Sequence, residues 1–127
     1  MNNLESRIQK SFIKHCRDRA KYDPLWDWIF AIPNGGKRDV VTASIQKAEG
    51  VLSGVADVFV PLPRKIQDTT GHCVVVWFGL WIEFKSPTGK QSVSQKLFQR
   101  HMEVRGYKYA ICRSASEAID EVEKYFD

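Results

Sequence analysis

The longest apolar run of the chain, from Val74 to Ile82, ends abruptly in the charged tripeptide Glu83-Phe84-Lys85. The run is rich in β-branched and aromatic residues, which predicts a strand buried on both faces. Because side chains alternate along a strand, Glu83 and Lys85 share one face and Phe84 takes the other. Opposite charges at the end of a buried strand are costly unless they are paired, hydrated or bound to a ligand. This tripeptide is therefore the first place to look for function.

Apolar positions that recur every three or four residues predict helices elsewhere in the chain. The first helix shows this spacing at Leu4, Ile8, Phe12 and Cys16. Asp23-Pro24 follows, and proline cannot continue a helix. In the second helix we expect Asp39 to be the N-cap and Gly50 to stop the C-terminal end. The segments expected to be helical are 3–20, 40–49, 92–105 and 115–126.

Both of the last two helices begin with a sequence typical of a capping box, Ser92-Val93-Ser94-Gln95 and Ser114-Ala115-Ser116-Glu117. Gly106 ends the first of this pair. In that helix the residues expected to face inward are Val93, Leu97, His101 and Val104. In the final helix they are Ala115, Ala118, Ile119, Val122, Tyr125 and Phe126.

Short β-rich segments separate the helices, and 26–32, 57–62 and 107–112 are predicted strands. The polar segment 64–71 is predicted to be a hairpin-like connection into the central strand. The order helix, strand, helix, strand-strand, helix, strand, helix predicts an α/β fold with one mixed sheet flanked by helices. We expect the 127 residues to form one domain, 1–127, with a modest core.

Composition limits the class of protein. Hydrophobic residues make up 43% and charged residues 27%, which is typical of a globular chain. No apolar run approaches the roughly 20 residues of a membrane span, and the N-terminus lacks the apolar segment of a signal peptide. Cys16, Cys73 and Cys112 are widely spaced and are predicted to be free thiols in a reducing compartment. We therefore expect a cytoplasmic protein that has no membrane partner.

The net charge of +4 is by itself a weak indication of nucleic-acid binding. The distribution of charge is more informative, because basic residues follow the central strand with few acids among them. They are Lys85, Lys90, Lys96, Arg100, Arg105, Lys108 and Arg113. Solvated helix faces would explain the same residues, so charge alone leaves both interpretations open.

Asp57 is a second acidic position of interest, at the start of a predicted strand and after the small residues 53–56. If its strand pairs with the central strand as a hairpin, Asp57 and Glu83 approach each other with Lys85 beside them. Two carboxylates repel unless a cation lies between them, and oxygen ligation suits Mg²⁺ or Mn²⁺. These groups are the ones that metal-dependent phosphodiester hydrolysis requires. An ordinary salt bridge between Glu83 and Lys85, with Asp57 in a turn, is the alternative.

The ordered set of motifs resembles the VRR-NUC domain, the virus-type replication-repair nuclease branch of the PD-(D/E)XK superfamily. The resemblance covers roughly residues 4–112, and it departs from the family at Ala56, where proline is more frequent. The motifs are Asn34-Gly35-Gly36, Lys47-Ala48-Glu49-Gly50-Val51, Ser53-Gly54-Val55-Ala56-Asp57, Glu83-Phe84-Lys85 and Gln95. The resemblance implies a restriction-endonuclease-like core with a mixed sheet flanked by helices.

The resemblance also implies the roles of the site residues. Asp57, Glu83 and the backbone carbonyl of Phe84 would bind Mg²⁺ or Mn²⁺, and Lys85 would be catalytic. Gln95 would complete the catalytic set of Asp57, Glu83, Lys85 and Gln95. Glu5 is the candidate for a further metal ligand from the first helix. Favourable placement of an acid in a first helical turn explains Glu5 equally well, and capping alone explains Gln95.

Contacts with DNA are predicted for three groups of residues. The turn Asn34-Gly35-Gly36 is expected to approach DNA or the site, although a tight turn that needs positive φ explains it as well. Lys37 and Arg38 beside it are expected to touch phosphates, as are Lys90, Lys96 and Arg100 on the other basic segment.

Stand-alone members of this family resemble Holliday junction resolvases and form homodimers. The resemblance therefore predicts a metal-dependent DNA endonuclease that cleaves four-way junctions as a homodimer. The alternative is a DNA-binding module without catalysis, or one directed to flaps or to a specific sequence, on the same fold.

Overall fold

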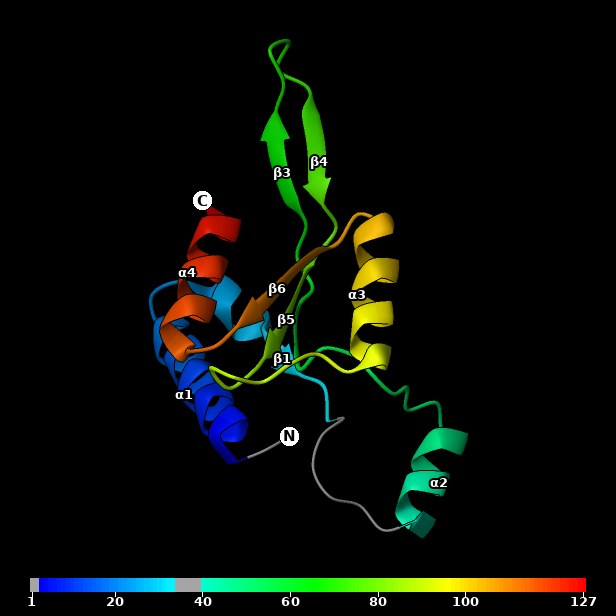
Figure 1. Ribbon diagram of the computed structural model, residues 1–127. Helices are drawn as coiled ribbons and strands as arrows, with labels where there is room; N and C mark the ends of the chain where they lie inside the picture. The colour runs from blue at the N-terminus through cyan, green and yellow to red at the C-terminus, as the bar shows by residue number, and fades with distance from the viewer. Residues whose placement is uncertain (1–2, 34–39) are drawn as a thin grey trace.

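The computed structural model describes residues 3–33 and 40–127 (Figure 1). The elements run in the order α1 (Asn3–Arg19), the 3₁₀ helix η1 (Pro24–Trp28), β1 (Phe30–Ala31), α2 (Val40–Ala48), β2 (Val58–Val60), β3 (Arg64–Gln67), β4 (Cys73–Trp77), β5 (Leu80–Phe84), α3 (Val93–Val104), β6 (Lys108–Cys112) and α4 (Ala115–Phe126). The helices lie where the apolar spacing predicts them.

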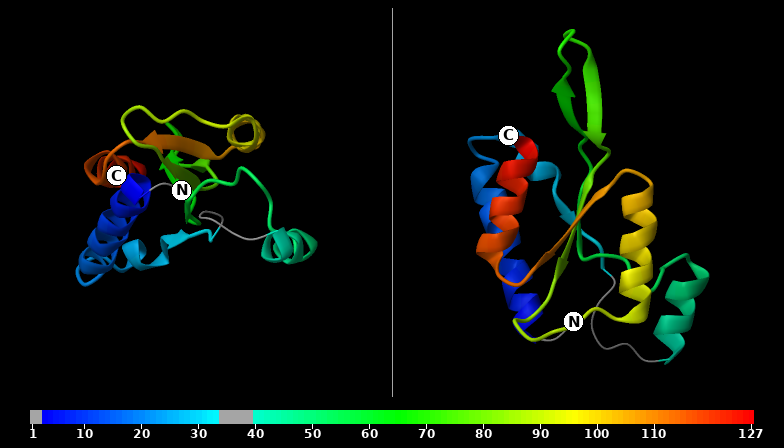
Figure 2. Two further views of the ribbon diagram at one scale, coloured as in Figure 1. Left: turned by 60° about the horizontal axis from the view of Figure 1, so that its bottom comes forward. Right: turned by 45° about the horizontal axis from the view of Figure 1, so that its top comes forward.

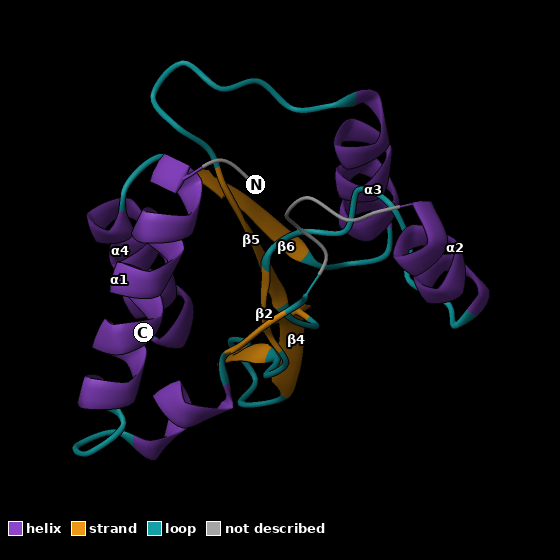
Figure 3. Ribbon diagram, turned by 90° about the horizontal axis from the view of Figure 1, so that it is seen from below, coloured by secondary structure: helices purple, strands orange, loops and turns teal. Residues whose placement is uncertain are grey.

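A mixed sheet organises the molecule. Among the described residues it has four strands in the order β1-β2-β5-β6, and a separate pair is formed by β3 and β4. β1 and β2 are antiparallel, as are β2 and β5, whereas β5 and β6 are parallel. Helices α1 and α4 pack together on one side of this sheet, and α3 lies on the other (Figures 2 and 3). The predicted α/β class, with a mixed sheet flanked by helices, is therefore confirmed.

The core lies between the sheet and the α1–α4 pair. β5 supplies Leu80, Ile82 and Phe84, which are almost entirely inaccessible to solvent. Its side chains pack against α1, where the rings of Phe12 and Phe84 are 5.6 Å apart, and against α4, which buries Val122. This packing immobilises β5, the strand that ends in the charged tripeptide. No helix in the described part of the chain is long and apolar enough to cross a membrane.

The prediction of one long buried strand from Val74 to Ile82 is wrong, because the run divides into two strands. Residues of β4 such as Val75 remain about 40% exposed. They pair with β3 in a hairpin that projects beyond the sheet (Figure 1). The run breaks at Gly79, where a Cβ atom would lie 2.9 Å from the ring of Phe59. Only β5 enters the core. The predicted hairpin-like connection, 64–71, contains strand β3, which pairs with β4.

Two further predictions are corrected by tertiary packing. Within the segment 26–32, residues 26–28 belong to the 3₁₀ helix η1, which Asp23 caps by accepting a hydrogen bond from Leu25 N (3.2 Å), and strand β1 keeps only two residues. In α3 the apolar residues predicted to face inward do not do so: Val93, Leu97 and Val104 are 83%, 54% and 76% exposed. The inward face of α3 instead carries Gln95, Phe98, Gln99 and Met102, which are partly buried. His101 is also exposed.

Helix α2 has no buried residue among those described. It ends as predicted at Gly50, which has a φ of +99° and whose amide donates to Lys47 O (3.1 Å). The predicted N-cap, Asp39, lies outside the described residues.

Candidate active site

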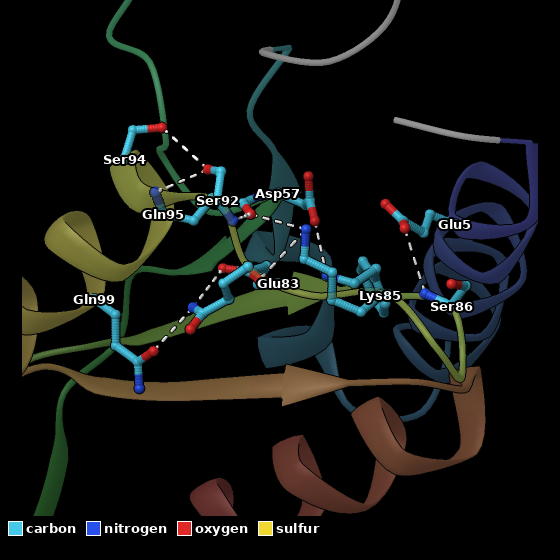
Figure 4. Close-up of polar contacts among 12 residues, drawn as sticks. Glu5, Asp57, Glu83, Lys85, Ser86, Ser92, Ser94, Gln95 and Gln99 are labelled. Atoms are coloured by element: carbon cyan, nitrogen blue, oxygen red, sulfur yellow. Dashed lines mark hydrogen bonds and ion pairs between the residues drawn. The ribbon is translucent and has the colours of Figure 1, made fainter.

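The pairing of β2 with β5 brings the two carboxylates together. The strands are antiparallel, with Val58 opposite Ile82, so that Asp57 lies beside the end of β5. The amide of Phe84 donates a 2.7 Å hydrogen bond to Asp57 Oδ2, and the amide of Asp57 donates to Ile82 O (3.1 Å). Both Asp57 and Glu83 are buried, at 8% and 0% exposure. The predicted approach of these two residues is confirmed (Figure 4).

Lys85 is also buried, although lysine is rarely buried without a specific partner. Its Nζ donates a 2.8 Å hydrogen bond to Gln95 Oε1 and lies 3.8 Å from Glu83 Oε2. Gln95 Oε1 also accepts from the amide of Ser92 (2.8 Å), which completes the predicted capping box of α3. Gln95 therefore uses the same oxygen to cap the helix and to hold the ammonium group of Lys85. Its capping role and its role in the site are compatible.

The two oxygens of Glu83 have different surroundings. Oε1 accepts hydrogen bonds from the hydroxyl of Tyr109 and from Gln91 Nε2, the latter at 3.1 Å. Oε2 is buried, and no group within the described residues donates a hydrogen bond to it. Lys85 forms an ion pair with Oε2 only at 3.8 Å, so a simple hydrogen-bonded salt bridge does not satisfy this atom. A buried carboxylate oxygen without a donor is costly unless a cation binds it.

Tyr109, Gln91 and Gln99 contribute to the site but were not identified from the sequence. Gln91 Nε2 donates to Gln99 Oε1 (2.9 Å) as well as to Glu83. Spacing could have found Gln99, which follows Gln95 by four residues on α3 and so shares its face, whereas Gln91 lies in the loop before the helix. No comparable signal marks Tyr109, whose position beside Glu83 depends on the parallel pairing of β5 with β6. Burial and the negative charge of Glu83 raise the pKa of Tyr109 far above its usual range, which keeps its hydroxyl a donor.

Glu5 reaches the site from the first turn of α1. It is 9% exposed, and its Oε2 accepts a hydrogen bond from the amide of Ser86 at 3.4 Å. Glu5 and Gln95 approach Lys85 from opposite sides (Figure 4). In the described part of the chain, no three His, Cys, Asp or Glu side chains are grouped closely enough to hold one metal ion. Metal ligation by Glu5 therefore stays a prediction.

The loop before Asp57 packs directly on the first turn of α3. Gly54 has a φ of +88°, and a Cβ atom there would lie 2.5 Å from the backbone carbonyl of Ser94. Ser53 Oγ and Ser94 Oγ are 3.4 Å apart at the same contact. This close approach sets the loop that leads to Asp57 against the helix that carries Gln95.

The predicted DNA contacts are only partly described. Lys90 precedes α3, whereas Lys96 and Arg100 lie on it, and all three side chains are exposed. Contact with DNA stays a prediction for these residues. The turn Asn34-Gly35-Gly36 and its neighbours Lys37 and Arg38 lie outside the described residues.

Burial is the main reason that the pKa of Asp57 is raised. Removal of this carboxyl from water raises its pKa from 3.8 to about 6, and the negative charges of Glu83 and Glu5 act in the same direction. The Phe84 amide and Lys85 oppose the shift only in part. At neutral pH the site therefore holds two buried carboxylates that repel each other, which is an arrangement that a cation would stabilise.

The raised pKa predicts how Asp57→Asn changes the stability of the metal-free protein. Because its pKa is raised, Asp57 binds a proton more tightly in the folded protein than in the unfolded chain. The stability gained in this way is fully present below pH 3.8 and is lost as the pH rises through about 6. Above that pH the ionised group lowers the free energy of unfolding by an amount on the order of 3 kcal/mol. Asparagine stays neutral and can still accept from the Phe84 amide. We expect thermal unfolding with EDTA to show Asp57→Asn several degrees more stable than wild type at pH 7.5.

The difference between Asp57→Asn and wild type is expected to shrink towards pH 4.5, where Asp57 is mostly protonated in the folded protein. Asp120→Asn is the matched control, because Asp120 is exposed on α4. A stabilisation that is the same at both pH values, or one equalled by Asp120→Asn, would contradict the assigned cause.

The donor set fits a divalent cation. Asp57 and Glu83 are hard oxygen ligands, and Mg²⁺ is commonly held by one or two carboxylates together with water and substrate phosphate. Glu83 Oε2 has no hydrogen-bond donor among the described residues, and the negative charges of Glu83 and Glu5 add to the effect of burial on the pKa of Asp57, so a cation would offset both. The carbonyl of Phe84 stays a predicted ligand.

Comparisons with known proteins place this site in a wider context. Residues 5–116 match the family model of the VRR-NUC domain. A solved structure described as a VRR_NUC domain protein superposes with a TM-score of 0.75 at 21% sequence identity, covering 100% of this chain and 95% of the other. This match shows a common fold. A search of curated proteins found no match.

Proposed function

The chain belongs to the VRR-NUC family of nuclease domains, and on this premise we propose that it is a Mg²⁺- or Mn²⁺-dependent DNA endonuclease. The observation that carries the proposal is the buried cluster of Asp57, Glu83 and Lys85, in which Glu83 Oε2 has no hydrogen-bond donor among the described residues. Burial of three charged side chains is costly in a small domain unless the charges are paired, hydrogen-bonded or bound to an ion.

The residues divide the chemistry among them. Asp57 and Glu83 would hold the cation, which supplies Lewis acidity toward the phosphoryl group and a water nucleophile at neutral pH. Lys85 places a desolvated ammonium group beside the carboxylates, where it would stabilise negative charge that develops on the phosphate. Gln95 holds this ammonium group through a hydrogen bond and thereby limits its motion. The rigid end of β5 keeps the three charged groups in one arrangement before DNA binds.

The proposed substrate is branched DNA, in particular a four-way junction cleaved by a homodimer. A two-fold dimer carries two equivalent active sites, which suits paired cuts on a symmetric junction. The exposed apolar side chains of α3, Val93, Leu97 and Val104, support association, because such residues commonly mark an interface. Light scattering should then give twice the chain mass of 14.6 kDa.

Cleavage of labelled four-way junction, flap and duplex DNA tests the proposed activity. We expect cutting with Mg²⁺ or Mn²⁺ and none with EDTA, and the junction is expected to be cut at least about tenfold faster than duplex of the same length, a difference of about 1.4 kcal/mol in activation free energy. Equal or faster cutting of plain duplex would remove the junction preference while leaving the nuclease assignment intact.

The alternative function is DNA binding without catalysis. Lys90, Lys96 and Arg100 are exposed basic residues that support this alternative, because phosphate contacts give affinity for DNA without catalysis. This alternative predicts strongly salt-dependent binding and no product with either metal. It would be established if wild type bound all three DNA forms but never cut them.

A further inference from the structure

Hydrogen bonds from the described residues hold only one of the two carboxylate oxygens of Glu83. Its Oε1 receives hydrogen bonds from two different elements: the Tyr109 hydroxyl from β6, and Gln91 Nε2 from the loop before α3. Its Oε2 receives none from the described residues and faces Lys85. The two donors therefore distinguish two oxygens that are chemically identical in a free carboxylate.

We propose that Tyr109 and Gln91 are positioning residues that fix the Glu83 carboxylate so that Oε2 is directed to the divalent cation. This inference rests on the proposed function and deepens it. Neither residue needs to touch the cation or DNA for this role. Groups that hydrogen-bond to metal ligands commonly orient them and change metal affinity about 10–100-fold.

Each donor is itself anchored. Tyr109 is 9% exposed, and its ring lies 6.3 Å from that of Phe98, centroid to centroid, in an edge-type arrangement. Gln91 is tethered by its 2.9 Å bond to Gln99 Oε1 on α3. Glutamate has three rotatable side-chain bonds, and two fixed donors on one oxygen restrict all of them. The carboxylate is therefore arranged before the cation binds, which lowers the entropy lost on binding.

The alternative interpretation is that Tyr109 and Gln91 only satisfy the buried charge of Glu83. It predicts that their removal lowers stability and leaves metal affinity unchanged at temperatures where the protein is folded. The positioning role predicts weaker metal binding in a protein that remains folded. Metal affinity therefore separates the two interpretations, and it does not depend on cleavage.

The test uses Tyr109→Phe, which removes only the hydroxyl, and Gln91→Met, which removes only the amide at similar length. Mn²⁺ binding is measured by isothermal titration calorimetry at 20 °C, with thermal melting to confirm that each variant is folded. We expect the dissociation constant to rise at least about tenfold in each variant. In cleavage assays, more metal should be needed for half-maximal rate, and the rate at saturating metal should change less.

Tyr107→Phe is the matched control, since Tyr107 packs its ring near Phe59 and Phe78 outside the Glu83 cluster. It is expected to bind Mn²⁺ like wild type. Because Tyr109 and Gln91 act on one oxygen, the double variant should lose less binding free energy than the sum of the single losses.

The outcomes separate this inference from the function on which it rests. If wild type binds Mn²⁺ and cuts DNA, but Tyr109→Phe and Gln91→Met bind Mn²⁺ with unchanged affinity, the positioning role is wrong and the proposed function stands. If wild type neither binds Mn²⁺ nor cuts, both are wrong. Gln91→Met keeps the test decisive if Tyr109→Phe does not fold, because Gln91 lies in a loop and is only partly buried.

Discussion

Lys85→Met is expected to lower the rate of DNA cleavage by about 10²–10³-fold, the loss that follows removal of one group that stabilises transition-state charge. Methionine matches lysine in length and lacks the charge. Because Lys85 is buried and pairs with Glu83, its removal leaves the carboxylates without their positive partner and should lower the free energy of unfolding, so cleavage is compared at a temperature where thermal melting shows that the variant is folded. Single-turnover cleavage of the four-way junction at saturating metal measures the effect on chemistry alone.

The control for Lys85→Met is Lys65→Met, because Lys65 is an exposed lysine on the β3–β4 hairpin. It removes the same charge from the chain but is expected to cut at the wild-type rate. DNA binding with EDTA should be similar in both variants. If Lys85→Met cut as fast as Lys65→Met, the catalytic role of Lys85 would be refuted, even in a protein that proved to be a nuclease.

Gly54→Ala is expected to have the second large effect, and it acts through the backbone. Alanine at a φ of +88° is strained, and its Cβ would overlap the carbonyl group of Ser94. Strain and overlap together should reduce the free energy of unfolding by about 3 kcal/mol or more. The first turn of α3 must also move, which displaces Gln95 from Lys85. We expect cleavage at 20 °C to fall by more than about tenfold, since small displacements of positioned groups are costly in rate.

Gly71→Ala provides the matched control for backbone strain. Gly71 has a φ of +86°, close to that of Gly54, but nothing lies within 4 Å of a Cβ atom there. It should lose only about 1–2 kcal/mol of stability and keep full cleavage activity. The difference between the two variants then measures the contact with Ser94. Equal losses of stability and activity in both would show that this contact does not position the site.

The predicted site was accessible from the sequence because its chemistry requires particular residue types in a particular order. A carboxylate at Asp57, the pair Glu83 and Lys85 on one face of a strand, and Gln95 in a capping box can all be read without knowing the packing. Antiparallel pairing of β2 with β5 then needed only the right register. The structure confirms this pairing and adds the burial that gives these charges their significance.

Helix α3 shows why a correct element can be assigned a wrong face. Its apolar stripe of Val93, Leu97 and Val104 has the spacing of a core helix, and its boundaries were predicted well. The stripe is nevertheless exposed, since the face that carries Gln95 and Gln99 turns toward the charged cluster. Periodicity shows that two faces differ, but it does not show which neighbour each face meets.

The hairpin of β3 and β4 has a related explanation. The residues from Val74 to Ile82 are continuous in hydrophobicity, and local propensity favours a strand throughout. Their division at Gly79 depends on the ring of Phe59, which comes from a different strand. Strand formation was therefore encoded locally, whereas burial depended on contacts between distant segments.

The amino-acid sequence by itself determined the positions of the helices and the α/β class, because these follow from local periodicity and capping. Residue chemistry singled out Asp57, Glu83 and Lys85, and the resemblance to the VRR-NUC domain added Gln95. Only the tertiary structure decided that β5 enters the core while β4 does not, and that Tyr109 and Gln91 hold one oxygen of Glu83. These features depend on strand register and on packing between segments far apart in the chain. The physical reason is that a hydrogen bond or a buried face needs a partner, and the partner is set by the fold.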